Sequence, residues 1–149
     1  MNKKSLGEIL KASGAINDDQ LGKALEFAKS NDVKIGEALV KTEACTSQVV
    51  HRGLARQMGL PFANLGKAEI RQEIIAMVPK EVAIENAVIP VAKRNGALIV
   101  AMSNPDFMVL DNLRFLLNQQ VDAAVATPED IEEALDHYYR LTGDLSSVL

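Results

Sequence analysis

Two glycines, Gly7 and Gly36, are the residues whose type and spacing point most directly to chemistry. They are 29 positions apart, and each lies between an apolar residue and a glutamate. A glycine near the start of a helix lets a ligand approach the backbone closely, and the amides of a helix N-terminus attract phosphate. The pair therefore predicts one of two features: a surface for a ligand with two similar halves, or two places at which helices pack closely.

The histidines and the single cysteine do not form a catalytic or metal-binding pattern. His51 and His137 have no cysteine or acidic partner at ligand spacing, which argues against a metal site. Cys45 has no second cysteine to pair with, and we interpret it as a small apolar residue in a reducing cytoplasm. The Gly-Lys pairs at 22–23 and 66–67 lack the other residues of a phosphate-binding loop. The sequence therefore predicts a protein that is not an enzyme, with no metal and no cofactor.

The two glycines lie in a segment, residues 5–57, that consists of two copies of one sequence motif. When the sequence is displaced by 29 positions, residues 6–10 fall on residues 35–39. Further along the segment, the class of residue still matches where the identity does not, as with Leu21 and Val50. Because two copies are too few for a solenoid, the repeat predicts a paired helical module with internal pseudo-symmetry.

Each copy is expected to form two short helices. In the first copy Gly14 ends one helix, and Asn17 caps the next with Gln20 in the reciprocal capping position. That second helix is expected to break at residues 30–32. Its apolar positions share one face: Leu21, Ala24, Leu25 and Ala28.

The second copy repeats this plan with different residues at the ends of its helices. Its first helix is expected to start near Ile35 and to turn at residues 43–44. Thr46 then caps the last helix, which is expected to stop at Gly59. The repeat thus predicts four short helices arranged as two pairs.

Residues 60–140 are expected to form a mixed α/β subdomain with about three strands. Asn95-Gly96 predicts a tight hairpin turn, because both of its central positions need positive φ. Pro90 places the strand before that turn at an edge or an irregularity of the sheet. Thr127 followed by Pro128 is typical of a helix start. The expected elements are an extended segment at 61–65, helices at 70–78, 79–86, 107–116 and 128–139, and strands at 88–92, 97–102 and 121–126.

The predicted organisation is therefore α+β, with a duplicated helical subdomain at 1–59, an α+β subdomain at 60–140 and a flexible tail or linker at 141–149. The chain has no run of 18 apolar residues, so we expect no membrane span. Residues 1–57 carry nine basic and seven acidic residues, whereas residues 58–149 carry seven and thirteen. This bias is too weak for duplex DNA, and the scarcity of aromatic residues argues against single-stranded nucleic acid. We therefore expect no nucleic-acid partner.

The chain resembles the N-terminal domain of the assembly ATPases of type II secretion systems and type IV pili. The resemblance covers nearly everything from Leu6 to Tyr139 and rests on short motifs that occur in the family's order and spacing. No single motif decides it, but the ordered set is specific. The motifs are Gly-Leu-Pro-Phe at 59–62, Val-Pro-Lys-Glu-Val-Ala at 78–83, Val-Ile-Pro-Val at 88–91, the segment 98–105 and Thr-Pro-Glu-Asp-Ile at 127–131.

In some members of that family the first half is a receptor for cyclic di-GMP, built from two tandem motifs with the displacement found here. The resemblance implies that apolar side chains contact the guanine faces while backbone and polar groups hold the remainder of the ligand. The matching positions in the first copy are Leu6, Gly7, Leu10, Gly14, Leu21 and Leu25. Those in the second copy are Lys34, Ile35, Gly36, Leu39, Val50, Leu54 and Gln57.

This sequence departs from the family's motif at four points. The leading arginine is replaced by Ser5 in the first copy and by Lys34 in the second. The first closing glutamine is Ala28, and the later glycine of the second copy is Glu43, which places a carboxylate near a dianionic ligand. Loss of a stacking guanidinium and a bidentate donor removes on the order of a few kcal/mol of binding free energy.

Two functions from different classes follow from the resemblance. The first is a non-catalytic regulatory and docking module of a secretion or pilus ATPase, which couples the motor to an inner-membrane platform protein. The second is a sensor that binds cyclic di-GMP through the tandem motif. Both imply a bacterial protein of the cytoplasm that reaches the inner membrane through its partners and serves protein transport.

Overall fold

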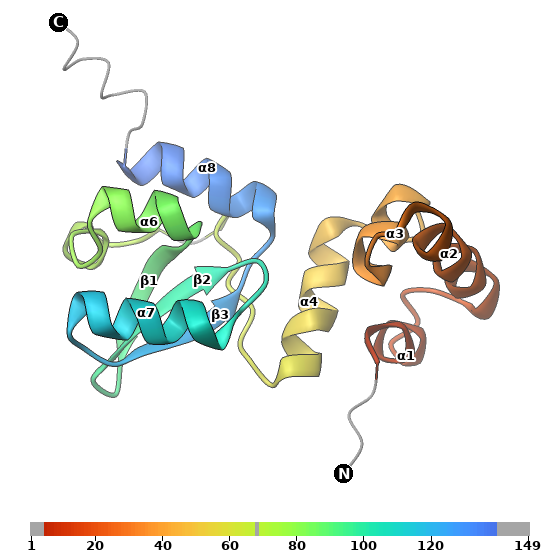
Figure 1. Ribbon diagram of the computed structural model, residues 1–149, viewed down its shortest axis with the longest axis horizontal. Helices are drawn as coiled ribbons and strands as arrows, with labels where there is room; N and C mark the ends of the chain where they lie inside the picture. The colour runs from red at the N-terminus through yellow and green to blue at the C-terminus, as the bar shows by residue number, and fades with distance from the viewer. Residues whose placement is uncertain (1–4, 68, 140–149) are drawn as a thin grey trace, which may run out of the picture. The chain divides into compact units, whose positions relative to one another are not determined.

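The computed structural model describes residues 5–67 and 69–139, and the chain divides into two compact units between Leu60 and Pro61 (Figure 1). The first unit is helical, and the second combines helices with a three-stranded sheet, which confirms the predicted α+β class. The tail predicted at 141–149 lies outside the described residues. Within the described ranges, no helix is long and apolar enough to cross a membrane.

The first unit contains four helices that follow the sequence repeat. The first and third helices begin and end at equivalent positions of the two copies, and the second and fourth begin at equivalent positions. The helices are α1 (Leu6–Ala12), α2 (Asp18–Asn31), α3 (Ile35–Lys41) and α4 (Ser47–Met58). The four predicted short helices are therefore present, but the most extensive packing joins α2 to α3 and α1 to α4, across the two copies rather than within them.

Side-chain caps start three of these four helices. Asn17 accepts a hydrogen bond from the Gln20 amide at 2.8 Å, and the Gln20 side chain accepts one from the Asn17 amide at 2.9 Å, as predicted. Thr46 caps α4 in the predicted way. Ser5 forms the same reciprocal cap on α1 with Glu8. Lys34, at the equivalent position before α3, provides no side-chain cap.

The turn between the two helices of each copy has the same backbone conformation in both copies. Gly14 has φ of +83° and its equivalent Glu43 has φ of +62°, so both lie in the left-handed region. A glycine takes this conformation without strain, whereas a glutamate has a Cβ that disfavours it. The break predicted at 30–32 is confirmed, because α2 ends at Asn31 and is followed by Asp32, which also has positive φ.

The core of the first unit is built from both copies of the repeat. Cys45 is half-buried and packs against this core, and burial raises the pKa of its thiol. Leu25 is the exception to the predicted apolar face of α2, because 53% of it is exposed. The core residues are Leu6, Leu10, Ile16, Ala24, Ala38, Leu39 and Val50.

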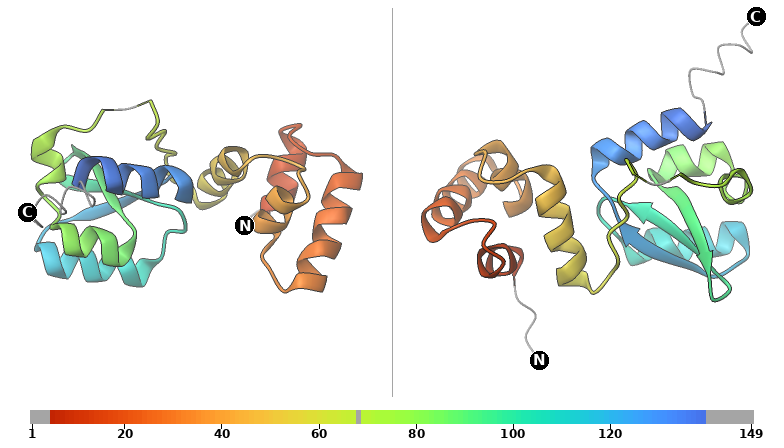
Figure 2. Two further views of the ribbon diagram at one scale, coloured as in Figure 1. Left: turned by 90° about the horizontal axis from the view of Figure 1, so that it is seen from above. Right: turned by 180° about the vertical axis from the view of Figure 1, so that it is seen from behind.

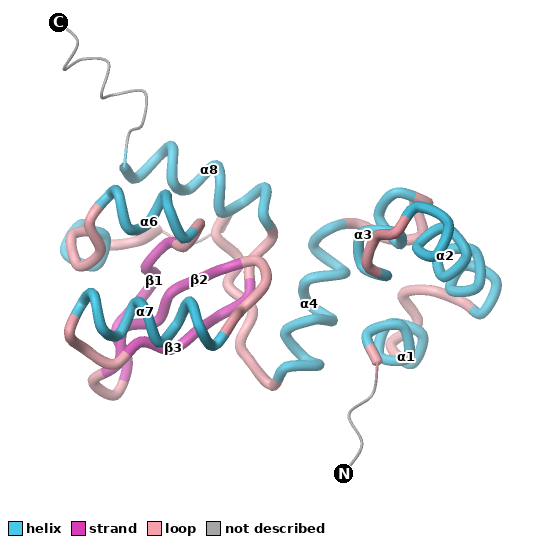
Figure 3. Tube along the Cα trace, in the orientation of Figure 1, coloured by secondary structure: helices cyan, strands magenta, loops and turns pink. Residues whose placement is uncertain are grey.

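The second unit contains a mixed sheet with strand order β1-β2-β3, drawn in magenta in Figure 3. The first two strands pair antiparallel, and the second and third pair parallel with a helical crossover between them. Its elements are α5 (Gln72–Ile75), α6 (Lys80–Asn86), β1 (Ile89–Arg94), β2 (Ala97–Met102), α7 (Phe107–Leu117), β3 (Val121–Val125) and α8 (Pro128–Tyr139).

The predicted hairpin and strand irregularity are both present in this sheet. Asn95 and Gly96 have φ of +52° and +81°, as a tight turn of this kind requires. Pro90 lies in the edge strand β1, at a shift of register between Pro90 and Ala92. The central strand β2 is almost entirely buried, since α7 packs on β3 and α8 packs on β1 and β2. These two helices lie on different sides of the sheet (Figures 1 and 2).

The extended segment that follows Leu60 joins the sheet beside β3. The Val125 amide donates to the Pro61 carbonyl at 2.8 Å, and the Ala63 amide donates to the Val125 carbonyl at 2.7 Å. Phe62 thereby forms a parallel bridge with Val125. The segment was expected to be extended, but its place in the sheet was not predicted.

The helix predicted at residues 70–78 is wrong, because only the short helix α5 forms there. The Ile70 amide donates to the Tyr138 hydroxyl at 3.0 Å, and the Tyr139 hydroxyl donates to the carbonyls of Ile75 and Val78. These bonds hold the backbone groups outside a continuous helix. Burial raises the pKa of Tyr139 to about 12. Pro79 occupies the capping position of α6 rather than its first turn.

Candidate ligand-binding surface

Gly7 and Gly36 occupy equivalent positions in α1 and α3, where another helix crosses closely. A Cβ atom on Gly7 would lie 2.8 Å from the Leu21 Cδ1 atom. A Cβ atom on Gly36 would lie 3.0 Å from the Val50 Cγ1 atom. Because Leu21 and Val50 are themselves equivalent in the repeat, the same glycine contact is built twice. Of the two roles that the sequence left open for these glycines, the structure supports close helix packing.

A third glycine, Gly53 in α4, was not singled out from the sequence. A Cβ atom there would lie 2.8 Å from a Leu10 methyl group and 3.0 Å from a Leu6 methyl group. Its equivalent in the first copy is Ala24, which is fully buried. The presence of a small residue at both positions was the signal that could have identified this contact. Leu6 also lies 3.5 Å from where a Gly36 Cβ would be, so α1 contributes to the packing of both copies.

The predicted site residues divide into an inner and an outer group. The inner group is buried in the first unit, so its members are not accessible to a ligand in solvent. The outer group is exposed or half-buried and reaches solvent. The inner group is Leu6, Gly7, Leu10, Leu39 and Val50, and the outer group is Gly14, Leu21, Leu25, Lys34, Ile35, Gly36, Leu54 and Gln57.

The outer group offers apolar contact area together with few charges. Leu25 on α2 and its equivalent Leu54 on α4 present apolar side chains at the same phase of the two copies. Lys34 is exposed at the start of α3 and supplies an ammonium group. Glu43 is exposed at the left-handed turn that follows α3 and supplies a carboxylate. The two copies therefore present equivalent leucines but not equivalent charges.

Two lysines of the first copy, Lys11 and Lys23, are paired with neighbouring acids. The Lys11 Nζ atom lies 2.8 Å from the Asp18 Oδ1 atom, and this hydrogen bond raises the pKa of Lys11. The Lys23 Nζ atom lies 3.4 Å from the Asp19 Oδ2 atom. Both acids lie in the first turn of α2, where their negative charges also interact favourably with the helix dipole. An anionic ligand close to Lys11 or Lys23 would therefore compete with these acids.

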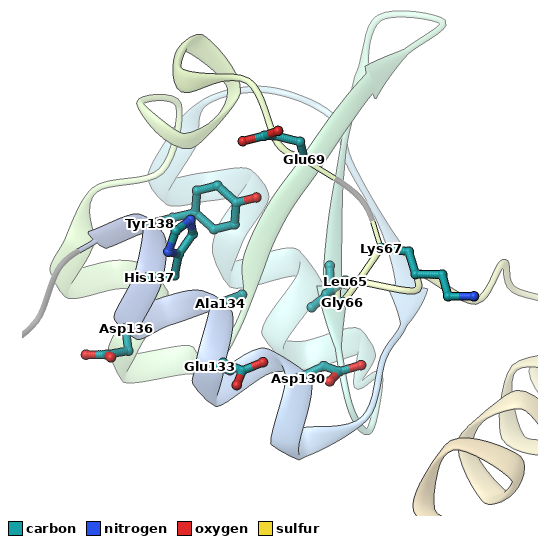
Figure 4. A pocket seen from close by; sticks show the side chains of 10 residues that line it. All are labelled: Leu65, Gly66, Lys67, Glu69, Asp130, Glu133, Ala134, Asp136, His137 and Tyr138. Carbon is teal, nitrogen blue, oxygen red and sulfur yellow. The ribbon is translucent and has the colours of Figure 1, made fainter.

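A pocket in the second unit lies between residues 65–67 and Glu69 on one side and α8 on the other (Figure 4). The His137 and Tyr138 rings meet edge to face there, and the Lys67 side chain points away from the other lining side chains. Among the described residues, no group of three or more His, Cys, Asp or Glu side chains could hold a metal ion. The lining residues are Leu65, Gly66, Lys67, Glu69, Asp130, Glu133, Ala134, Asp136, His137 and Tyr138.

Comparison with known sequences gives a match over more than half of the chain. Residues 58–145 match the MshEN domain. The chain is also similar to the type IV pilus assembly ATPase PilB of Myxococcus xanthus, with 39% identity over 139 residues. That alignment covers 93% of this chain and 25% of PilB, so the chain spans about a quarter of the length of this relative.

Two solved structures share the fold. The structure of MshE with cdg (cyclic di-GMP) superposes with a TM-score of 0.75 at 24% identity, and covers 91% of this chain and 99% of that chain. The N-terminal domain of XpsE superposes with a TM-score of 0.59 at 18% identity, and covers 93% of this chain and 99% of that chain. In both cases the alignment includes the helical unit as well as the sheet-containing unit.

Proposed function

The chain belongs to the MshEN domain family, and from this premise we propose that it is the non-catalytic regulatory and docking module of a type IV pilus or type II secretion ATPase. In this role it couples the motor to an inner-membrane platform protein from the cytoplasmic side. The observation that carries the proposal is the 39% identity to a pilus assembly ATPase over 93% of this chain but only 25% of the ATPase. A region of that size fits a regulatory domain attached to a separate motor.

Affinity purification tests the docking role. The tagged chain, expressed in its source bacterium and purified with mild detergent, is expected to recover inner-membrane pilus or secretion proteins, identified by mass spectrometry. A matched control is the Leu113→Asp variant, which places a charge at a fully buried position and should lose the fold of the second unit. Recovery of no such protein, or equal recovery by the unfolded control, contradicts the proposal.

A second function is favoured by the repeat in the first unit. We propose that the outer group of site residues binds cyclic di-GMP and that binding alters docking. Support comes from the shared backbone plan of the two copies and from the likeness to MshE, whose structure was solved with cyclic di-GMP. Leu25 and Leu54 would contact the two guanine faces, while Lys34 and Gln57 would donate to phosphate or base oxygens.

Glu43 gives this sensor hypothesis a discriminating test. Its carboxylate would repel a dianion, so removing the charge should strengthen binding by a few fold. Isothermal titration calorimetry of the intact chain with cyclic di-GMP is expected to show saturable heat, and Glu43→Gln and Glu43→Gly should both bind more tightly. Glu43→Gln removes only the charge, whereas Glu43→Gly also relieves the left-handed backbone.

The controls for this titration are GTP and a surface variant of the outer group. GTP carries the same base but not the paired arrangement of two guanines, so it should bind much more weakly. Leu25→Ser changes a side chain that is largely exposed and should weaken binding without unfolding the unit. Absence of heat at high micromolar cyclic di-GMP for the wild-type chain and for Glu43→Gly contradicts the sensor hypothesis.

A further inference from the structure

The outer face of α7 exposes four large apolar side chains, which we call the α7 stripe. Phe107, Met108 and Phe115 are 80%, 79% and 82% exposed, and Leu116 is 51% exposed. The opposite side of the helix holds Leu110 and Leu113, which are buried in the second unit. Single exposed apolar residues are ordinary, but several large ones on one helix typically mark an interaction site.

The spacing of the stripe suits another helix. Phe107 and Met108 lie in the first turn of α7, Phe115 and Leu116 lie in its last turn, and the exposed Asp111 and Asn112 lie between the two pairs. At 1.5 Å per residue the two pairs are about 12 Å apart along the helix axis, which is slightly more than two helical turns. Two of the four phenylalanines in the chain belong to these pairs, and large aromatic side chains often anchor binding surfaces.

The charged residues on and beside α7 are two acids and one base. Asp106 and Asp111 are exposed on or beside α7. Arg114 is the basic residue of the helix, and its guanidinium is held by Asp111 at 2.7 Å and by the Val121 carbonyl at 3.1 Å. Residues 61–139 contain twelve acidic and six basic residues, counting each residue of the range. A complementary partner therefore combines apolar side chains with lysine or arginine.

We propose that the α7 stripe is the docking surface for an amphipathic helix of a partner protein, with an apolar face flanked by basic residues. The proposal rests on the docking role proposed above and assigns that role to a surface. A second copy of the chain fits less well, because an antiparallel α7 pair would bring the two Asp111 carboxylates close together. Four side chains also cover less area than a stable dimer needs. An anionic membrane fits less well, because a membrane-surface helix is flanked by cations.

A labelled peptide tests this surface directly. The probe is an amphipathic helical peptide of about 18 residues, with leucine at every third or fourth position and lysine on the remaining face. Fluorescence anisotropy with the intact chain is expected to show saturable binding. A peptide with glutamate in place of lysine, and a scrambled peptide of the same composition, should each bind about tenfold more weakly or worse.

Substitutions in the chain identify where the peptide binds. Phe107→Ser with Phe115→Ser should weaken binding about tenfold or more, because two exposed aromatic anchors are removed without disturbing the core. Ile84→Ser is the matched control, since Ile84 is 41% exposed on α6 in the same unit. Asp111→Asn should weaken binding by a smaller factor. Far-ultraviolet circular dichroism establishes that each variant is folded.

Several results would overturn the assignment. Two of them concern the peptide: equal binding of the scrambled or glutamate peptide, or unchanged peptide binding by the double phenylalanine variant. The other two would identify a different occupant: self-association of the chain, or binding of the chain to phosphatidylcholine–phosphatidylglycerol vesicles, that the double variant abolishes. The affinity purification separates this proposal from the docking role. If pilus or secretion proteins are recovered equally by the double variant, the α7 stripe is not their site. If the α7 stripe binds the peptide but no pilus or secretion protein is recovered, only the proposed docking role is contradicted.

Discussion

The two copies of the helical repeat share a backbone but not the residues that stabilise its ends. In the first copy Ser5 caps the opening helix and a glycine, Gly14, takes the left-handed turn. In the second copy Lys34 provides no side-chain cap, and Glu43 takes the same turn with a Cβ atom. The shared features are the apolar spacing and the glycine at each helix crossing. Packing between the helices therefore determines the architecture, while end residues adjust its stability.

The largest effect is expected at the equivalent core leucines. Leu10→Ala and Leu39→Ala should each lower the free energy of unfolding by about 2–5 kcal/mol, because both side chains are buried. Urea unfolding followed by circular dichroism measures the change. Similar losses of unfolding free energy would show that both copies contribute to one core. A loss confined to one variant would show that the stability of the unit depends mainly on the copy that carries that leucine.

The next effect is expected at the helix crossings. Gly7→Val and Gly36→Val should each cost about 1–3 kcal/mol, since even a Cβ atom would press on Leu21 or Val50. Gly22→Ala is the matched control in α2. Nothing lies within 4 Å of a Cβ atom there, so this change should stabilise the helix by up to about 1 kcal/mol. If all three variants are stabilised, the glycine crossings do not limit the packing.

A reciprocal exchange at the left-handed turns should give a smaller effect with opposite signs. Gly14→Ala should destabilise the chain by about 1–2 kcal/mol, because alanine is disfavoured at φ of +83°. Glu43→Gly should stabilise it by about 0.5–1 kcal/mol, since relief of the backbone is partly offset by the greater freedom of glycine in the unfolded chain. Thermal unfolding of both variants tests the signs, and two changes of the same sign would contradict the explanation.

The smallest effect is expected at the helix caps. Ser5→Ala should cost about 1 kcal/mol through loss of the reciprocal cap with Glu8. Lys34→Ser should gain about 0.5 kcal/mol, because Glu37 already stands three residues later at the position that completes such a cap. Chemical denaturation of the two variants provides the measurement. A destabilised Lys34→Ser variant would mean that the lysine has another stabilising role.

Local signals in the sequence were sufficient for most of the fold. The Asn17–Gln20 cap, the Asn95-Gly96 turn and the start of α8 each depend on residues within a few positions of one another, and each is present. The helix predicted at 70–78 failed because the hydroxyls that bond its backbone groups come from Tyr138 and Tyr139, more than sixty residues later. The parallel pairing of β2 with β3 likewise depends on contacts that no local pattern contains.

The candidate site was only partly readable from the sequence. The repeat identified the equivalent positions, but a spacing of three or four residues does not say which apolar residues face inward. Leu10 and Leu39 point into the core, whereas Leu25 is largely exposed although it was assigned to an apolar face. Gly53 was missed because its counterpart is Ala24, so that identity alone did not mark the position. The α7 stripe was also missed, because exposed and buried phenylalanines look alike in a sequence.

The short bridge between Phe62 and Val125 also has a mechanical consequence. Only Leu60 separates the glycine that ends α4 from the segment that bonds to β3. The linker between the two units is thus very short, so a pulling force applied to the first unit would act directly on the backbone hydrogen bonds of Val125. Stretching of the chain would strain these hydrogen bonds at the edge of the sheet before a linker could extend.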